Sequence, residues 1–473
     1  MDALWKNPRD GMCLVKLLKD TTFAGDNIDG DRVMMMALPP PSASDWVRFT
    51  NYARRVQTLD VISYTETMDT PLQWWSVLDH LPITQVFPRL RSVRWKWASE
   101  YRCSQGALLL KAPLRRLAVN DLDLRGVEQL IELLPGCSAT LERLQIGTRF
   151  RGEDDHLVAA SLWRALAMLH QLAHLDVSLY VPQAFCRLAS LSHLTSLCLL
   201  IDSADTEDAK ASFPALKSLE LSVKTDTDAV AKLLQRMVLP VLEHLSITDY
   251  FLRRLVMPMH RANAAHVRLT LQEVAKVTSL RSFAFKCHRS ISMAPTEALD
   301  AQALSSLHAL RGLETLDVAA LAVSMGAADV EPMARAWPRM QNLQLYERHA
   351  IFGTHPPCVL EVVDILPFAR LCPHLRELGL LVHIGPPGPA APPDDDSELP
   401  VHAALKTLRA AVSLPPFTPA LRVLARTFPA AEVKGYGHDP DRDEAVNEAK
   451  KALVHELYGT QFEDTDGLGA LTF

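Results

Sequence analysis

The stretch FPALKSLELSV, residues 213–223, decides the fold because the spacing of its apolar residues recurs along the chain. Leu216, Leu219 and Leu221 are spaced three and then two residues apart. Written as L-x-x-L-x-L, with other apolar residues allowed, this phrase occurs twelve times. The copies start at least 22 residues apart, at Val56, Leu90, Leu114, Leu141, Leu172, Leu194, Leu216, Leu242, Leu280, Leu313, Met340 and Leu375. An internal repeat of this length indicates a solenoid of stacked units.

The phrase predicts a strand, because alternate side chains of an extended segment point to opposite faces. Its last two apolar residues then enter a core, and the residues between them point the other way. Between copies the period becomes helical: residues 225–240 place four apolar residues on one face, behind Thr225 or Asp226 as the N-cap and before Pro240 as a stop. Residues 125–137 and 153–169 behave alike. The sequence therefore predicts an α/β, leucine-rich-repeat-like solenoid with a curved parallel sheet and helices on its convex side.

The ninth residue of the phrase differs from that of regular leucine-rich repeats, which carry Asn or Cys there to bond the turn. Five of the copies here have Arg149, Tyr180, Asp202, Lys224 and Tyr250 at that position. We therefore expect turns and curvature that are less uniform than in a regular horseshoe.

The remaining sequence predicts four segments. We expect a helical N-terminal cap at 1–52, the irregular solenoid at 53–384, a flexible Pro/Asp-rich loop at 385–400, and a closing repeat with a helical cap at 401–473. Within the last segment, residues 401–413 and 441–459 are predicted to be helical, and 428–436 a weak thirteenth strand. Six of the eight tryptophans lie in the first hundred residues, where bulky side chains can seal the open end of a solenoid; an exposed aromatic binding patch is the alternative.

Composition narrows the class of partner. The 473 residues carry a net charge of −6 and no run of basic residues, which gives no reason to expect nucleic acid or an acidic membrane surface. No secretory signal and no long apolar run is evident. The eight cysteines are scattered without paired spacing, which favours free thiols in a reducing compartment, the cytoplasm or the nucleus.

Motifs for catalysis or metal binding are weak. His170 and His174 are four residues apart, but they run into a predicted strand and are better explained as turn or surface residues. Asp439, Asp441 and Asp443 alternate as in a calcium loop, yet Glu444 replaces the required glycine, so we interpret them as a helix N-terminus. The sequence therefore predicts no enzyme, no metal and no cofactor, although a site assembled from distant residues stays open.

The N-terminal segment resembles a large group of fungal F-box proteins with irregular leucine-rich repeats. The resemblance lies in DALW (2–5), LVKLL (14–18), the order of aromatic and proline residues from Trp75 to Trp95, and residues 38–61. Within 38–61 it is carried by Asp45, Trp46, Phe49, Tyr52, Ala53, Arg54, Arg55 and Val56.

The resemblance implies the substrate-recognition subunit of an SCF-type ubiquitin ligase, in which an F-box grips an adaptor subunit and the repeats hold a target. The F-box signature, Leu-Pro-x-Glu-Ile, should precede Ala3 and has no match here, so no adaptor-binding residue carries over. We expect either a truncated gene product or a relative that lacks the F-box and only binds. The adaptor is a partner only if an F-box exists upstream.

Candidate binding residues lie between the last two apolar residues of each phrase, on the predicted concave face. They are mixed in charge, which favours one heterogeneous protein target over a repetitive polymer. A scaffold or signalling regulator unconnected with ubiquitin is the alternative function. The candidates are Asp60, Arg94, Gln145, Asp176, Glu220, Ser246, Asp317 and Gln344.

Overall fold

The computed structural model describes 43–62, 83–96, 109–148, 155–180, 185–201, 210–223, 228–249, 264–287, 299–319, 323–345, 360–384, 399–412, 418–435 and 440–458. Nearly all of the predicted N-terminal cap and loop 385–400 lie outside these residues, as do Trp5, Trp74, Trp75 and Trp97. The chain divides into two compact units, and Leu216 and Lys217 lie on either side of the main division. Unit 1 holds residues up to 216 apart from 202–205, which belong to unit 2.

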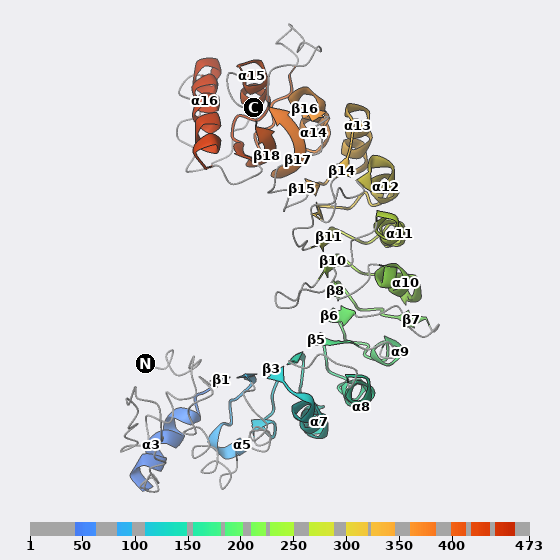
Figure 1. Cartoon of the computed structure of the whole chain (residues 1–473). Helices are drawn as coiled ribbons and strands as arrows, with labels where there is room; N and C mark the ends of the chain where they lie inside the picture. The colour runs from blue at the N-terminus through green and yellow to red at the C-terminus, as the bar shows by residue number, and fades with distance from the viewer. Residues whose placement is uncertain are drawn as a thin grey trace, which may run out of the picture. The chain divides into compact units, whose positions relative to one another are not determined.

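Unit 1 contains a parallel sheet in which strands follow one another in chain order, from β1 to β6. The strands of that sheet in unit 1 are β1 (Thr58–Ile62), β2 (Ser92–Lys96), β3 (Arg116–Leu122), β4 (Arg143–Thr148), β5 (His174–Tyr180) and β6 (Ser196–Ile201). Unit 1 also contains the short strand β7 (Ala211–Ser212), which lies outside that sheet. Its helices are α3 (Ala43–Ala53), α5 (Ile83–Val86), α7 (Leu124–Leu133) with the 3-10 turn η1 (Leu134–Cys137), α8 (Asp155–Ala167) and α9 (Phe185–Leu188). Helices α7, α8 and α9 line one face of this sheet (Figure 1).

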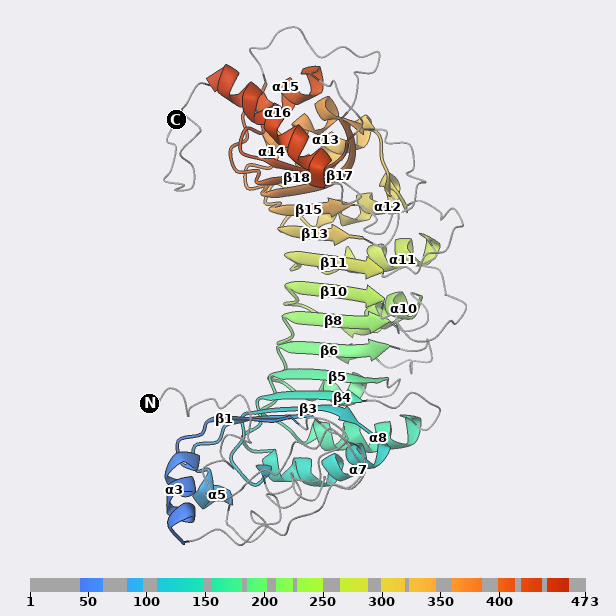
Figure 2. The same ribbon diagram turned by 60° about the vertical axis from the view of Figure 1, so that its left-hand side comes forward.

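Unit 2 repeats the plan with the parallel order β8-β10-β11-β13-β15-β17-β18-β19. The strands are β8 (Ser218–Val223), β9 (Met237–Val238), β10 (His244–Asp249), β11 (Ser282–Cys287), β12 (Leu299–Asp300), β13 (Thr315–Val318), β14 (Val323–Ser324), β15 (Asn342–Leu345), β16 (Leu360–Glu361), β17 (Glu377–Ile384), β18 (Thr407–Val412) and β19 (Glu432–Gly435). The helices and turns are α10 (Asp228–Arg236), α11 (Ala264–Val274), α12 (Ala301–Ser305), η2 (Ser306–Ala309), α13 (Ala327–Ala336), η3 (Val362–Ile365), α14 (Leu366–Leu371), α15 (Thr418–Thr427) and α16 (Pro440–Tyr458). Figure 2 shows the strands of unit 2 as parallel rungs, with α10 and α11 beside them.

The predicted fold class is confirmed: parallel strands alternate with helices along one face of each sheet, as in a leucine-rich-repeat-like α/β solenoid. Each of the twelve phrases leads into a parallel strand of unit 1 or unit 2. In β8, Leu219 and Leu221 are buried and Glu220 between them is exposed, as the alternation requires. The helices predicted at 125–137, 153–169 and 225–240 are present as α7, α8 and α10.

One secondary-structure prediction is wrong. Residues 401–413 were expected to be helical, but they contain strand β18, which pairs in parallel with β17 and with β19. The segment carries a thirteenth copy of the phrase, in which Leu405 and Leu408 are buried and Ala410 stands in the third apolar place. The strand predicted at 428–436 is present as β19, and the helix at 441–459 as α16.

A recurrent hydrogen-bond fork links the start of most strands to the next one along the sheet. The carbonyl oxygen at the second residue of a phrase accepts two N–H groups, from the second and third residues of the following phrase. In unit 2 the Lys217 carbonyl accepts from Glu243 and His244, both at 2.9 Å, and the Glu243 carbonyl accepts from Arg281 and Ser282 at 2.8 and 2.9 Å. The same pattern joins the Gln57 carbonyl of unit 1 to the next phrase. This fork fixes the register of successive strands. The turns after the strands lie largely outside the described residues, so the expected irregularity at the ninth position stays a prediction.

A further buried residue precedes the first apolar residue of most phrases by three positions. Phe87, Leu169, Phe213 and Phe428 take this place, and their carbonyls accept the N–H of the residue three further on. Two cysteines lie at similar places, Cys372 three residues before Leu375 and Cys137 four residues before Leu141. Both are free and buried, and burial raises the pKa of Cys137 to about 11 and that of Cys372 to about 12. Free thiols were predicted, and for these residues and the half-buried Cys198 that prediction is confirmed.

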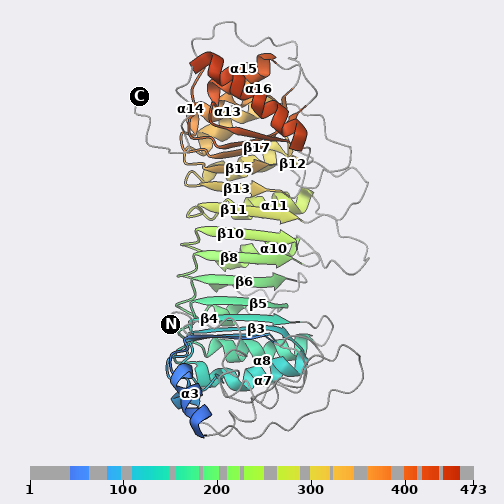
Figure 3. The same cartoon turned by 90° about the vertical axis from the view of Figure 1, so that its left-hand side faces the viewer.

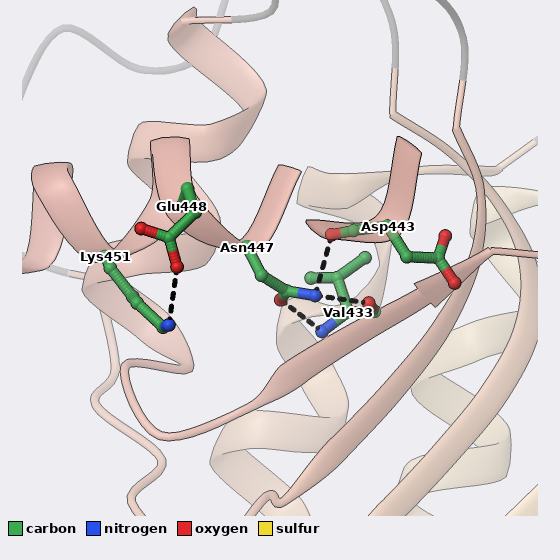
Figure 4. A network of polar contacts seen from close by, with 5 residues as sticks. All are labelled: Val433, Asp443, Asn447, Glu448 and Lys451. Carbon is green, nitrogen blue, oxygen red and sulfur yellow. Dashed lines mark hydrogen bonds and ion pairs between the residues drawn. The ribbon is translucent and has the colours of Figure 1, made fainter. Parts of the chain in front are cut away.

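Helix α16 covers the outer edge of β19 (Figure 4). The Asn447 amide accepts from the Val433 N–H and donates to the Val433 carbonyl, both at 2.8 Å, as a further strand would. The ammonium group of Lys450, which is buried, donates to the carbonyls of Pro429 and Ala431 at 2.8 and 2.7 Å. The side chain of Asn447 therefore occupies backbone groups on the outer side of β19, which hinders pairing with a further strand there.

We expect Leu245→Ala to lower the free energy of unfolding by about 2–5 kcal/mol, because it leaves a cavity in the core behind β10. The matched control is Leu269→Ala on α11, where the side chain is 43% exposed and the cost should stay within about 0.5 kcal/mol. Urea denaturation followed by circular dichroism measures both. Equal losses in the two variants would contradict the inward orientation of the phrase.

Burial lowers the pKa of Lys450 from 10.5 to about 8. At pH values between about 8 and 10.5, the unfolded chain holds more protons on Lys450 than the folded chain does. The contribution of Lys450 to the free energy of unfolding therefore rises with pH, by up to about 1.4 kcal/mol per pH unit. Below about pH 8 both states are protonated and the full cost of the buried charge remains. We expect the stability of the wild type relative to Lys450→Met to rise from pH 8 to 10.5 and to be flat below. Cysteine ionisation affects both proteins and cancels in the difference, and a pH-independent difference would contradict the prediction.

Candidate functional site

The open face of the strands in each unit is the face turned away from the helices (Figure 3). It carries the third, fifth and seventh residues of the phrases, because the fourth and sixth residues are buried on the other face. In unit 1, four of the predicted binding residues lie at one level across it. Asp60 pairs in register with Arg94, and Gln145 with Asp176. Ala118 lies between Arg94 and Gln145.

Unit 2 carries the other four predicted residues at the equivalent level. Glu220 is in register with Ser246, and Asp317 with Gln344. Ala284 lies between Ser246 and Asp317. The sequence pattern thus placed all eight residues on the open faces, four in each unit, and their role in binding stays a prediction.

Five of the predicted residues are already held by neighbours. Asp60 and Arg94 form an ion pair at 3.5 Å, and Asp317, Gln344 and Asp176 have other partners. Asp317 is only 8% exposed, and its carboxylate lies 3.4 Å from Lys286. Gln344 donates to Glu377 at 3.0 Å. Burial raises the pKa of Asp176, while a hydrogen bond from Cys198 acts in the opposite direction. By contrast, Glu220 and Gln145 are exposed. These two are better placed to contact a partner than the buried carboxylates.

A second row of charges, which the sequence analysis missed, runs along the second residues of the phrases. In unit 2, Lys217 lies 3.2 Å from Glu243, and Arg281 lies 3.6 Å from Glu314. Hydrogen bonding to Lys217 lowers the pKa of Glu243, and the charge of Lys217 adds to the effect. Exposed pairs of this kind contribute little to stability, because water and salt screen the two charges. Because positive and negative side chains alternate along this row of second residues, their charges largely cancel in unit 2.

Unit 1 is different, because arginines cluster on its open face and in the row of second residues beside it. We call Arg91, Arg94, Arg115, Arg116 and Arg143 the arginine group; all five are exposed residues on or just before β2, β3 and β4. The signal was in the sequence, since the stretches APLRRLAVN and ATLERLQIG carry Arg115, Arg116 and Arg143 at the second or third position of their phrases. Arg94 occupies a fifth position and was among the predicted residues, but considering only that position overlooked the other four arginines.

The pKa of His174 is sensitive to the positive charge of the arginine group. His174 starts β5 in register with Arg143, and Arg143 is in register with Arg116. Its pKa is lowered, first by burial, then by the positive charges of Arg143 and Arg116, with Glu142 acting in the opposite direction. His170 lies in the turn before the strand, so the two histidines do not form a helical pair.

Groups suited to metal binding are absent from the described residues: no three His, Cys, Asp or Glu side chains there gather as ligands. The buried His402 is a structural residue, since its Nε2 lies 2.8 Å from the Cys372 carbonyl and its ring packs beside Phe428. None of the described helices is both long enough and apolar enough to span a bilayer. The one described tryptophan of the N-terminal set whose side chain is placed, Trp95, is buried.

No protein-family model matches this chain, and no curated protein is significantly similar to it. Among 67 matching chains of solved structures is a protein from Bacteroides fragilis determined by a structural genomics consortium. It is 13% identical, the match covers 77% of this chain and 81% of that one, and the TM-score is 0.29. A likeness at this level carries no argument about fold or function.

We expect Arg143→Gln to raise the pKa of His174, because the variant removes one of the charges that disfavour the imidazolium form. The exposed Arg187, on α9 of the same unit, provides the control Arg187→Gln, which should leave the pKa unchanged. NMR titration of histidine-labelled protein, with His174 assigned from His174→Gln, measures the shift. A pKa that does not move in Arg143→Gln would contradict an effect of the Arg143 charge on the imidazole of His174.

Proposed function

We propose that this chain is a non-enzymatic protein-binding repeat module, and that it forms the substrate-recognition part of an F-box-type ubiquitin ligase. The observation that carries the binding role is the register of the open faces. Parallel pairing aligns the fifth residues of successive phrases at one level, from Glu220 to Ser246 onward in unit 2. A partner chain can therefore contact side chains from several repeats at once.

The variety of these side chains supports a protein target over a polymer. Along one level of unit 2 a carboxylate, a hydroxyl, a methyl group, a second carboxylate and an amide follow one another, at Glu220, Ser246, Ala284, Asp317 and Gln344. A repetitive ligand would be matched by repeated side chains, whereas a folded or extended protein presents a varied surface. Around Glu220 the neighbours are short: Ser222 bonds Thr248 at 3.2 Å, so the glutamate extends beyond them.

The ubiquitin-ligase part of the proposal rests on the resemblance of residues 38–61 to fungal F-box proteins. Part of that segment is helix α3, whose Phe49 and Ala53 are buried. Phe49 packs edge-to-face against Phe87, at 6.3 Å between ring centroids, close to the first strands of unit 1. The resembling residues thus include core residues of the first repeats. In this proposal an F-box on an additional segment binds the adaptor, and the protein works in the cytoplasm or the nucleus.

Affinity capture with the full chain, followed by mass spectrometry, tests the binding role. We expect Glu220→Lys combined with Ser246→Arg to deplete the captured proteins at least severalfold, because both changes lie on the open face of unit 2. The control is Gln272→Arg with Glu444→Lys, two exposed helical positions of the same unit. It should capture the same partners as the wild type.

Two results would count against the proposal in different ways. Equal depletion by the control pair, or no partner with the wild type, would contradict binding through the open face. Partners that are captured through the open face, but whose ubiquitylation and abundance do not depend on this protein in cells, would contradict the ligase role. A scaffold or signalling regulator would then be the better description.

A further inference from the structure

The open face of unit 1 carries an excess of positive charge, although the whole chain has a net charge of −6. The arginine group (Arg91, Arg94, Arg115, Arg116 and Arg143) lies on three adjacent strands or just before them. Two acidic side chains contact it: Asp60 lies 3.5 Å from Arg94, and Glu142 lies 3.2 Å from Arg115. The arginine group therefore has five positive charges, and two carboxylates form ion pairs with it.

Arg116 and Arg143 are the pair without an acidic neighbour. They are directly in register on β3 and β4, so their backbones are only about 4.8 Å apart. Among the described residues, no carboxylate lies within ion-pair distance of either guanidinium group. Like charges directly opposite each other on a sheet are unfavourable. An anion between the two would remove that repulsion.

The backbone fixes where these side chains start. The Arg91 carbonyl accepts the N–H groups of Arg115 and Arg116 at 2.7 and 2.9 Å, in the fork that joins each strand to the next. The guanidinium group of Arg91 donates to the Leu90 carbonyl at 3.1 Å. One level further along β3 the side chain is that of Ala118, so the arginines extend beyond their neighbour. The sheet thus holds the cationic side chains at defined positions.

We propose that the arginine group of unit 1 docks an acidic segment of a partner polypeptide, with carboxylates between Arg116 and Arg143. Arginine suits this role because its planar fork binds a carboxylate through two parallel hydrogen bonds. The inference rests on the proposed protein-binding function and names the chemistry of one part of the partner.

A short acidic peptide fits this surface better than a nucleic acid does. The positive charge spans only β2 to β4, and the face beside it carries Asp60, Glu142 and Asp176. A polynucleotide needs a long basic track, and each of these carboxylates would repel its phosphates. An acidic stretch of a few residues can occupy the arginines without crossing the acidic positions.

The test uses fluorescence anisotropy with a labelled hexaglutamate peptide and the full chain. We expect the peptide to bind, with an affinity that falls as salt is raised. Hexaglutamine, which has the same length without charge, should not bind. Arg116→Gln with Arg143→Gln should weaken hexaglutamate binding at least about tenfold, since two charge-assisted contacts are lost.

The matched control is Arg125→Gln with Arg164→Gln, which removes two exposed arginines from α7 and α8 of the same unit. It should bind hexaglutamate as the wild type does. A second readout is the pKa of His174, which should rise when the peptide's carboxylates approach. Equal melting temperatures of the two double variants exclude a folding defect as the cause.

Four outcomes would overturn the proposal: no hexaglutamate binding at low salt, equal binding of hexaglutamine, an equal loss in the control variant, or tighter binding of single-stranded polyuridine than of the peptide. Each leaves the open-face function intact if the Glu220 and Ser246 variant still loses captured partners. If capture fails and hexaglutamate binding succeeds, the general function falls while the acidic-docking surface stands.

Discussion

The fork of two hydrogen bonds on one carbonyl is the interaction on which each unit depends. It pairs the first backbone groups of a strand with the preceding strand before the regular ladder begins, as at Glu243, Arg281 and Glu314. A single repeat cannot satisfy these groups alone, and it buries few apolar side chains by itself. Stability therefore comes from stacking. The return segments can vary in length, because the fork and the two inward apolar residues of the phrase suffice to place each strand.

Stacking leaves an unpaired edge wherever it ends, and the described C-terminal edge is closed by side chains. Asn447 reproduces the donor and the acceptor of a missing strand, while Lys450 places a buried ammonium group against two carbonyls. Burying that charge lowers stability near neutral pH, as its lowered pKa shows. An apolar residue would avoid this cost but would leave the carbonyls of Pro429 and Ala431 without these donors. The protection of the edge from pairing with another strand offsets the stability lost by burying the ammonium group of Lys450.

The sequence pattern predicted the strands and the orientation of their side chains, because burial of two alternate residues imposes a period of two. It failed at residues 401–413, where closely spaced alanines and leucines also satisfy a helical period and alanine favours helix. Pairing with β17 and β19 overrides that preference. Four of the five residues of the arginine group, all except Arg94, were missed for another reason. Arg116 and Arg143 are 27 residues apart in sequence, and only the parallel register makes them neighbours.

The same parallel register places opposite charges next to each other in unit 2 and like charges next to each other in unit 1. Along the second positions of unit 2, opposite charges alternate from Lys217 to Glu314, and each largely neutralises the next. Such a row offers little net field to a partner. In unit 1 the equivalent rows bring Arg91 beside Arg115 and Arg116 beside Arg143, so the charges add. A fold that needs only its inward residues has no structural reason to retain this repulsion, and a ligand of opposite charge is the physical condition under which it becomes favourable.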